Sequence, residues 1–156
     1  MDNVKLGIIG LGRLGRKHAE NIHYKIQNAE LTAICSVVQE ELDSVGDEMN
    51  PKYRTSDFKE LIENDELDAI VIASSSQEHC RMLCRAAEAG RKKVYIEKPL
   101  GMTIEEIDRI KAAVQANRGM LLQVGYNRRF DQSVQAAKKK IEDGFIGKPI
   151  QVRMIN

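Results

Sequence analysis

Near its start the chain reads Val4-Lys5-Leu6-Gly7-Ile8-Ile9-Gly10-Leu11-Gly12-Arg13-Leu14-Gly15, and this stretch decides how the rest of the sequence is interpreted. An apolar, β-prone run ends in three glycines with the spacing G-x-G-x-x-G. Apolar residues then recur at helical spacing, at Leu14, Ala19, Ile22 and Ile26. The glycines therefore lie where a strand turns into a helix.

A strand-to-helix turn with this glycine spacing is typical of dinucleotide-binding sites. Gly10 permits the tight turn, Gly12 lets the backbone approach a pyrophosphate, and Gly15 lets the helix pack close to the strand. The helix start offers free N–H donors and a positive dipole end. Similar turns also occur without a ligand, but here strand, glycines and amphipathic helix follow one another in the required order. We predict that these glycines, with Arg13 and Leu14, bind the cofactor.

Composition narrows the possible partners and location. The 156 residues are 42% hydrophobic and 30% charged, which is enough for one core and one domain or slightly more. The net charge of +1 gives no reason to expect nucleic acid or an anionic membrane as a partner. The N-terminus resembles neither a signal peptide nor a membrane span, and three cysteines without framework spacing fit a reducing compartment. We expect a cytoplasmic protein.

Strand and helix patterns alternate along most of the chain. The predicted strands cover residues 4–9, 31–38, 52–54, 68–73, 93–96 and 120–124. Helix signals separate them, including Asp57 as an N-cap and Thr103 with Glu106 as a capping box. Six strands alternating with helices predict an α/β domain with a doubly wound parallel sheet, the Rossmann arrangement, over residues 1–126.

Residues 127–156 do not fit that domain. A helical pattern over 131–142 is followed by glycines, and residues 150–155 alternate like a half-buried strand. We interpret this part as a connecting helix and the first strand of a C-terminal substrate domain that is absent from the chain. Such a strand lacks neighbours for its hydrogen bonds, so we expect it to be mobile or to pair with a second copy in a homo-oligomer.

Ser36 follows the second strand, where an acidic side chain normally accepts hydrogen bonds from the adenosine ribose hydroxyls. A serine there, with no arginine after it, leaves the choice between NAD and NADP open. Arg13 has two interpretations of equal weight, contact with a 2′-phosphate or a solvated arginine at a helix start. Because Ser36 brings no carboxylate to repel a 2′-phosphate, we expect both cofactors to bind within about tenfold of each other.

The fourth strand runs into the segment 74–79, which ends in His79. We assign Ser74 and His79 to the cofactor-binding edge of the sheet, while capping the next helix is an equally good role for Ser75. His79, Cys80 and Cys84 lie on one helix and suggest a metal site. The two cysteines, however, share an apolar stripe with Leu83, which favours buried, unliganded thiols, so we predict no metal.

Glu97-Lys98-Pro99 follows the fifth strand and is the most informative stretch for chemistry. A lysine at a strand end, beside a carboxylate and before a proline, is placed like an active-site group that takes up a proton. The alternative is a surface lysine in an ordinary turn, and spacing alone gives both nearly equal weight.

Three stretches together resemble the N-terminal half of the Gfo/Idh/MocA oxidoreductases, and within that family the inositol 2-dehydrogenases. They are the glycine-rich segment 7–22, residues 97–101 (Glu-Lys-Pro-Leu-Gly) and residues 125–131 (Gly-Tyr-Asn-Arg-Arg-Phe-Asp). The resemblance implies that Lys98 contacts the substrate hydroxyl and helps remove its proton. It also implies that Glu97 lies near the nicotinamide ribose and that Asn127 and Arg128 face the cofactor cleft.

Three classes of function compete. The favoured one is the NAD(P)-binding domain of a dehydrogenase that moves hydride between a sugar or cyclitol secondary alcohol and nicotinamide, inactive as this fragment. The alternative is a non-catalytic dinucleotide-binding regulatory protein, against which the intact Glu97-Lys98-Pro99 argues. A nucleic-acid module using Arg128, Arg129 and the lysines 138–140 is disfavoured because no aromatic platform accompanies these charges.

Overall fold

β1 (Val4–Ile9) lies in the middle of a parallel sheet, with a strand paired on each side. Within the described residues the sheet has six strands in the order β3-β2-β1-β4-β5-β6. The other strands are β2 (Ala29–Cys35), β3 (Tyr53–Thr55), β4 (Ala69–Ile72), β5 (Lys93–Ile96) and β6 (Leu121–Val124). All pairings are parallel. The order reverses between β1 and β4, which confirms the predicted doubly wound Rossmann sheet.

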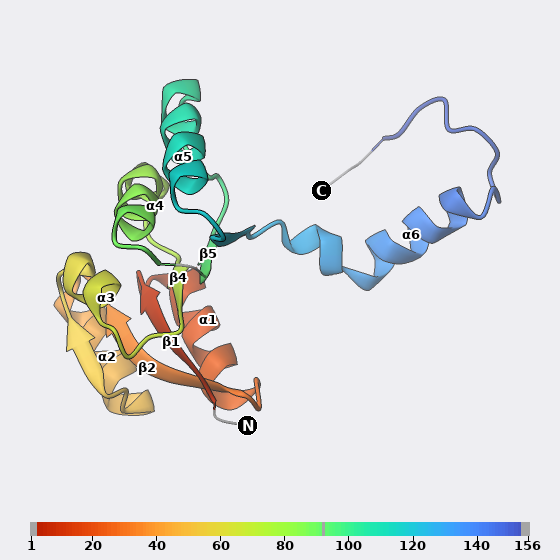
Figure 1. Cartoon of the computed structure of the whole chain (residues 1–156). Helices are drawn as coiled ribbons and strands as arrows, with labels where there is room; N and C mark the ends of the chain where they lie inside the picture. Colours follow the sequence, from red (N-terminus) through yellow and green to blue (C-terminus); the bar gives the residue numbers. More distant parts are fainter. Residues whose placement is uncertain (1–2, 92, 154–156) are drawn as a thin grey trace. The chain divides into compact units, whose positions relative to one another are not determined.

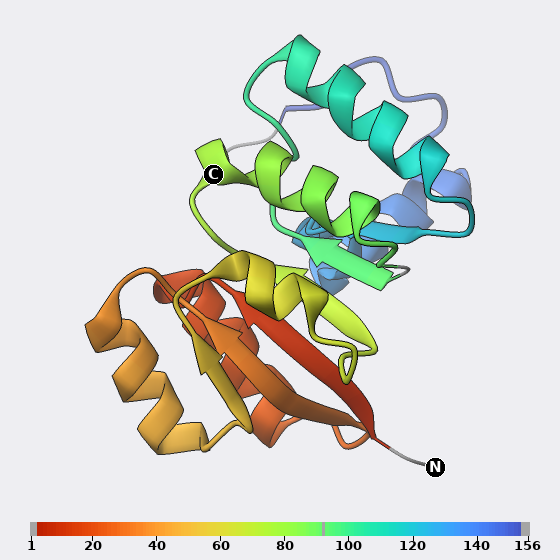
Figure 2. The same cartoon turned by 60° about the vertical axis from the view of Figure 1, so that its left-hand side comes forward.

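The computed structural model describes residues 3–91 and 93–153. The chain divides into two compact units, Met1–Gly125 and Tyr126–Asn156. The sheet and its helices make up the first unit, and Figures 1 and 2 show it from two directions. Its helices are α1 (Arg13–Tyr24), α2 (Gln39–Met49), α3 (Phe58–Glu63), α4 (His79–Glu88) and α5 (Ile104–Ala116), with the 3₁₀ turn η1 (Ser76–Glu78) before α4.

The central strands β1, β2 and β4 bury both of their faces over most of their length, as their nearly continuous apolar sequences require. Ile8 packs under α1 and α2, whereas its neighbour Ile9 packs under α3 and α4. In β4, Val71 lies in the same buried cluster as Ile8, and Ile72 lies in the same buried cluster as Ile9. Successive side chains of a strand point to opposite faces, so the two layers of helices cover opposite sides of the sheet, as Figure 2 shows for α1 and α3.

Helix starts follow the predicted caps. The Asp57 carboxylate accepts a hydrogen bond from the Lys59 amide at 2.8 Å, and the Thr103 hydroxyl accepts one from the Glu106 amide at 3.2 Å. These bonds satisfy backbone donors that have no partner inside the helix. Ser75 precedes η1 but makes no capping hydrogen bond through its side chain.

The second strand ends earlier than predicted. It stops at Cys35 rather than Val38, because the Ser36 hydroxyl accepts a hydrogen bond from the Val38 amide at 3.1 Å and turns the chain toward α2. Val37 is consequently 85% exposed. The apolar run 31–38 suggested a longer strand because a local turn through a serine hydroxyl leaves little trace in hydropathy.

The second unit contains the 3₁₀ turn η2 (Asn127–Phe130) and α6 (Gln132–Glu142). Asp131 caps α6 by accepting hydrogen bonds from the amides of Ser133 and Val134. The predicted strand over 150–155 is wrong for residues 150–153, which have no regular secondary structure, and residues 154 and 155 lie outside the described range. A single strand without a partner cannot satisfy its backbone groups, which explains the irregular conformation.

Candidate functional site

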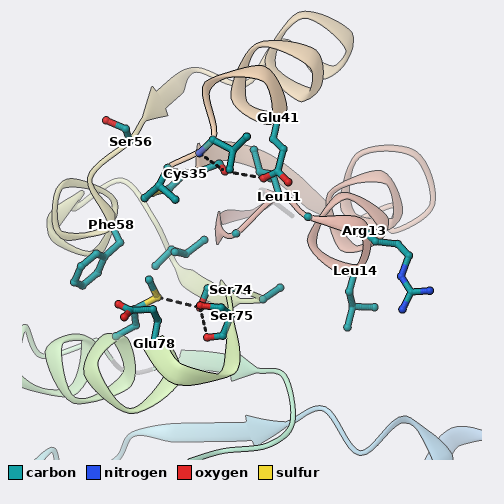
Figure 3. Close-up of a pocket in the computed structure, with 18 of the residues that line it drawn as sticks. Leu11, Arg13, Leu14, Cys35, Glu41, Ser56, Phe58, Ser74, Ser75 and Glu78 are labelled. Carbon is teal, nitrogen blue, oxygen red and sulfur yellow. Dashed lines mark hydrogen bonds between the residues drawn. The ribbon is translucent and has the colours of Figure 1, made fainter.

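A pocket of about 510 Å³ opens at the carboxyl ends of β1, β2 and β4, where the strand order reverses. The glycine loop after β1, the start of α2 and the segment after β4 contribute to its wall. Figure 3 shows Glu41, Phe58 and Ser74 reaching it from three separate segments. Ligands of open parallel α/β sheets bind at this topological position.

The glycine loop fits a phosphate group closely. Gly10 has φ +92°, and a Cβ there would lie 2.6 Å from the Ser74 backbone, so a side chain would be strained and would collide. A Cβ on Gly15 would lie only 1.9 Å from the Gly10 carbonyl oxygen. Beside Gly12, in contrast, the nearest atom to an added Cβ is a Glu41 oxygen at 3.8 Å. The loop is therefore tight where the protein packs against itself and open at Gly12.

Gly12 is the N-cap of α1, and its side without a Cβ leaves the helix start accessible. The first turn of α1 contains no acidic residue of its own, so its free N–H groups and positive dipole end have no acidic partner within the helix. The pocket thus offers backbone donors suited to a diphosphate, which is the chemistry that a dinucleotide requires. The residues present fit this group. Arg13 and Leu14 also line the pocket, and both are exposed.

Ser36 lies in the pocket wall with a side chain that is already engaged. Its hydroxyl donates to a Glu41 carboxylate oxygen at 2.8 Å, and the residue is only 5% exposed. Sequence reasoning missed Glu41, which is in the first turn of α2 and lines the pocket. A detectable signal was its position five residues after Ser36, which places it close to the strand end once a helix begins near residue 39.

Ser74 lines the pocket, as its position after β4 suggested. His79 does not line it, because its ring is 1% exposed and turned inward. Ring atom Nδ1 lies 2.7 Å from the Pro99 carbonyl oxygen, and Nε2 lies 3.2 Å from that of Ser74. His79 therefore joins the loops after β4 and β5, and a direct contact with cofactor stays a prediction.

Glu97 and Lys98 follow β5 and differ in their exposure to solvent. Lys98 is exposed, and within the described part of the chain its side-chain nitrogen makes no hydrogen bond or ion pair. Glu97 is 8% exposed, and neither residue belongs to the pocket wall. One Glu97 oxygen accepts a hydrogen bond from the Tyr95 hydroxyl at 2.8 Å and contacts His18 at 2.9 Å. Contact between Glu97 and a nicotinamide ribose stays a prediction.

The electrostatics of Glu97 follow from this environment. Burial alone would raise the pKa of its carboxyl, but hydrogen bonds from Tyr95 and His18 outweigh burial and hold that pKa below its usual value. Burial and the Glu97 charge together raise the pKa of the Tyr95 phenol, so this hydroxyl is a permanent donor at neutral pH.

The remaining predicted site residues lie in the second unit. Asn127 begins η2, and the Arg128 guanidinium lies 3.5 Å from the Asp131 carboxylate within the same unit. Their contact with a cofactor stays a prediction.

Cys80 is 3% exposed and packs in the core with Leu83, and burial raises the pKa of the Cys84 thiol to about 11. Among the described residues no group of three metal-binding side chains converges. Across the same residues, none of the helices combines the length and the apolar character needed to cross a membrane.

Comparison with known proteins agrees with this geometry. Residues 4–126 match the sequence model of the Gfo/Idh/MocA family, which is described as an oxidoreductase family with an NAD-binding Rossmann fold. The chain belongs to the Gfo/Idh/MocA family. The resemblance of its glycine-rich and Glu-Lys-Pro segments to this family is thereby confirmed, and so is its assignment as an NAD-binding domain.

Several relatives within the Gfo/Idh/MocA family are inositol dehydrogenases. The chain is 36% identical over 152 residues to the myo-inositol 2-dehydrogenase of Thermotoga maritima, covering 97% of the chain and 44% of that protein. It is 35% identical to the NAD⁺-dependent scyllo-inositol 2-dehydrogenase of Bacillus subtilis, covering 94% of the chain and 42% of that protein.

A solved structure of the family also resembles the chain. The scyllo-inositol dehydrogenase of Lactobacillus casei, crystallised with NAD(H) and scyllo-inositol, superposes with a TM-score of 0.89 at 39% identity. The match covers 94% of this chain and 43% of that one. The chain thus spans less than half the length of the relatives that it matches.

Proposed function

We propose that the chain forms the cofactor half of an NAD-dependent dehydrogenase acting on a cyclitol or a related polyol. The observation that carries this proposal is the pocket at the strand-order reversal, lined by Gly12 and by the start of α1, whose own first turn has no acidic residue. The inositol dehydrogenases among its relatives support the substrate class. When bound, NAD accepts hydride from a secondary alcohol.

The residues of this chain have separate tasks in the proposed reaction. The backbone donors at the start of α1 hold the diphosphate, and the apolar wall formed by residues such as Phe58 and Met82 excludes water from the rings. Lys98 takes the substrate hydroxyl proton at its Nζ atom, which has to be a neutral amine for this step, and its exposed side chain at the end of β5 is free to reach a substrate. His79 keeps the Lys98–Pro99 loop fixed against the loop after β4.

Further parts of the proposal concern organisation and location. We place the cofactor domain in residues 1–126 and a connection to a substrate-binding domain in residues 127–156, in line with the longer relatives. Lys98 then provides one part of a site whose other groups lie elsewhere, so we expect no turnover from the 156 residues alone.

The free thiols of Cys35, Cys80 and Cys84 support a reducing, cytoplasmic location.

Calorimetric titration of the whole chain with NAD tests the central claim. We expect saturable binding that Gly12→Val abolishes, because its side chain would fill the space left beside the helix start. Ala112→Val, at an exposed position of α5, is the matched control and should bind normally. Absence of heat from a folded sample would overturn the proposal. An assay of nicotinamide reduction with myo- and scyllo-inositol would show whether turnover needs further residues.

A further inference from the structure

The end of β2 is where a dinucleotide-binding sheet places the acceptor for the adenosine ribose hydroxyls. Ser36 occupies this position, but its hydroxyl proton is donated to Glu41 at 2.8 Å and its oxygen accepts from the Val38 amide at 3.1 Å. The residue is also only 5% exposed. The Ser36 hydroxyl therefore already makes hydrogen bonds within the protein, and it is a poor acceptor for the ribose hydroxyls.

Glu41 brings a carboxylate to the same place. One of its oxygens accepts the Ser36 proton. The other lies 3.8 Å from the point that a Cβ of Gly12 would occupy, so it faces the open side of the glycine loop. In Figure 3 the Glu41 side chain extends from its helix toward Leu11, over the pocket. Ser36 thus orients a carboxylate that sequence position alone did not reveal.

The two arginines of the pocket wall do not neutralise the negative charge of Glu41. Arg81 is paired with Glu78 at 2.5 Å. Arg13 is exposed at the start of α1, and Figure 3 shows its guanidinium extending away from Glu41. Apart from the chain neighbours of Gly12, Glu41 supplies the atom nearest to the open side of this glycine.

We propose that Glu41 makes this domain selective for NAD over NADP. Its carboxylate accepts hydrogen bonds from the ribose hydroxyls of NAD and repels the 2′-phosphate of NADP. This inference rests on the proposed function, since it assumes that the pocket binds a dinucleotide. It replaces the expectation of weak discrimination that Ser36 alone suggested.

Titration of the full chain with each cofactor tests the proposal. We expect NADP to bind roughly thirtyfold or more weakly than NAD. Glu41→Gln retains an oxygen for the Ser36 hydrogen bond but removes the charge, so NADP affinity should rise about tenfold or more while NAD affinity changes much less. Glu40→Gln is the matched control, because Glu40 lies in the same helical turn, is exposed and does not line the pocket.

A second measurement needs no variant and guards against a Glu41→Gln protein that fails to fold. ADP-ribose and its 2′-phosphorylated form should differ in wild-type affinity by a factor similar to that between NAD and NADP. The difference should narrow in high salt, which screens charge repulsion.

Each outcome bears on one claim. Wild-type affinities for NAD and NADP within about threefold of each other would overturn the selectivity but leave the proposed function standing. Equal effects of Glu41→Gln and Glu40→Gln would also overturn it. Failure of every dinucleotide to bind a folded chain would overturn the proposed function itself.

Discussion

His18 Nε2 lies 2.9 Å from a carboxylate oxygen of Glu97, joining α1 to the segment that leads to Lys98. The two residues are separated by 79 positions in sequence, and Tyr95 completes the cluster with a hydroxyl that donates to the same oxygen. The Glu97 carboxylate is thus directed into the protein. This inward direction makes the Glu97 carboxylate part of what stabilises the fold.

Glu97→Gln should lower the free energy of unfolding by about 1–3 kcal/mol at pH 7, because it weakens a buried, charge-assisted hydrogen-bond cluster. The folded pKa of Glu97 is depressed, so its stabilisation is present above the unfolded value of about 4.3 and disappears as pH falls through the folded pKa. Urea unfolding at a series of pH values should therefore show the two proteins converging in acid.

Glu40→Gln removes an exposed carboxylate and serves as the control for this series. A gap between wild type and Glu97→Gln that stays constant from neutral pH into acid would contradict the role assigned to the Glu97 charge.

Gly15→Ala should destabilise the domain by at least about 1–3 kcal/mol, because the new methyl group would overlap the Gly10 carbonyl oxygen. Gly12→Ala should cost less than about 1 kcal/mol, since its methyl group would make only an ordinary van der Waals contact with Glu41 and only the N-cap preference changes. Denaturant midpoints measured without cofactor separate these effects from binding. Equal losses in the two variants would show that the loop is less tightly packed at Gly15 than the structure indicates.

His79→Ala should cost roughly 2–4 kcal/mol, because it leaves a cavity and removes ring contacts to two main-chain carbonyl groups. His23→Ala changes an exposed histidine of α1 and should have almost no effect. Thermal unfolding of both variants provides the comparison. If both melt together with wild type, the ring does not hold the two loops.

The segment 148–153, in which the apolar Ile150 and Val152 alternate with polar residues, should promote association of the 156-residue chain. Ile150 is 100% exposed and Val152 is 74% exposed, and an apolar segment with free backbone groups favours pairing with a copy of itself. Light scattering should give a larger particle for the whole chain than for one ending at Gly147. Identical sizes for two folded samples would assign any assembly to other surfaces.

Much of the fold could be predicted because each strand and helix carries a local signal. The run Ile8-Ile9 and the glycine spacing determine a strand-to-helix turn within a few residues, and the Asp57 and Thr103 caps act over two or three positions. Six such alternations leave few topologies, since parallel crossovers are right-handed.

The side chains around the site were harder to predict, because their directions depend on contacts distant in sequence. Whether Glu97 faces a ligand or the interior depends on His18, which only the folded sheet brings near. The position of Glu41 depends on a turn made by the Ser36 hydroxyl, which hydropathy does not reveal. His79 was grouped with Cys80 by helical spacing, although its ring bonds to two loops instead.

Because the strands are parallel, the sheet has one edge at which all strands begin and another at which all strands end, and these two edges suit different uses in protein engineering. The carboxyl edge holds the pocket, whereas the turn between α1 and β2 and the turn at Gly119 lie at the amino edge. A Cβ on Gly119 would meet no atom within 4 Å, so an inserted peptide has room there, although φ +83° favours keeping the glycine itself. A fluorophore or affinity tag inserted after Gly119 would report on the domain without obstructing its ligand.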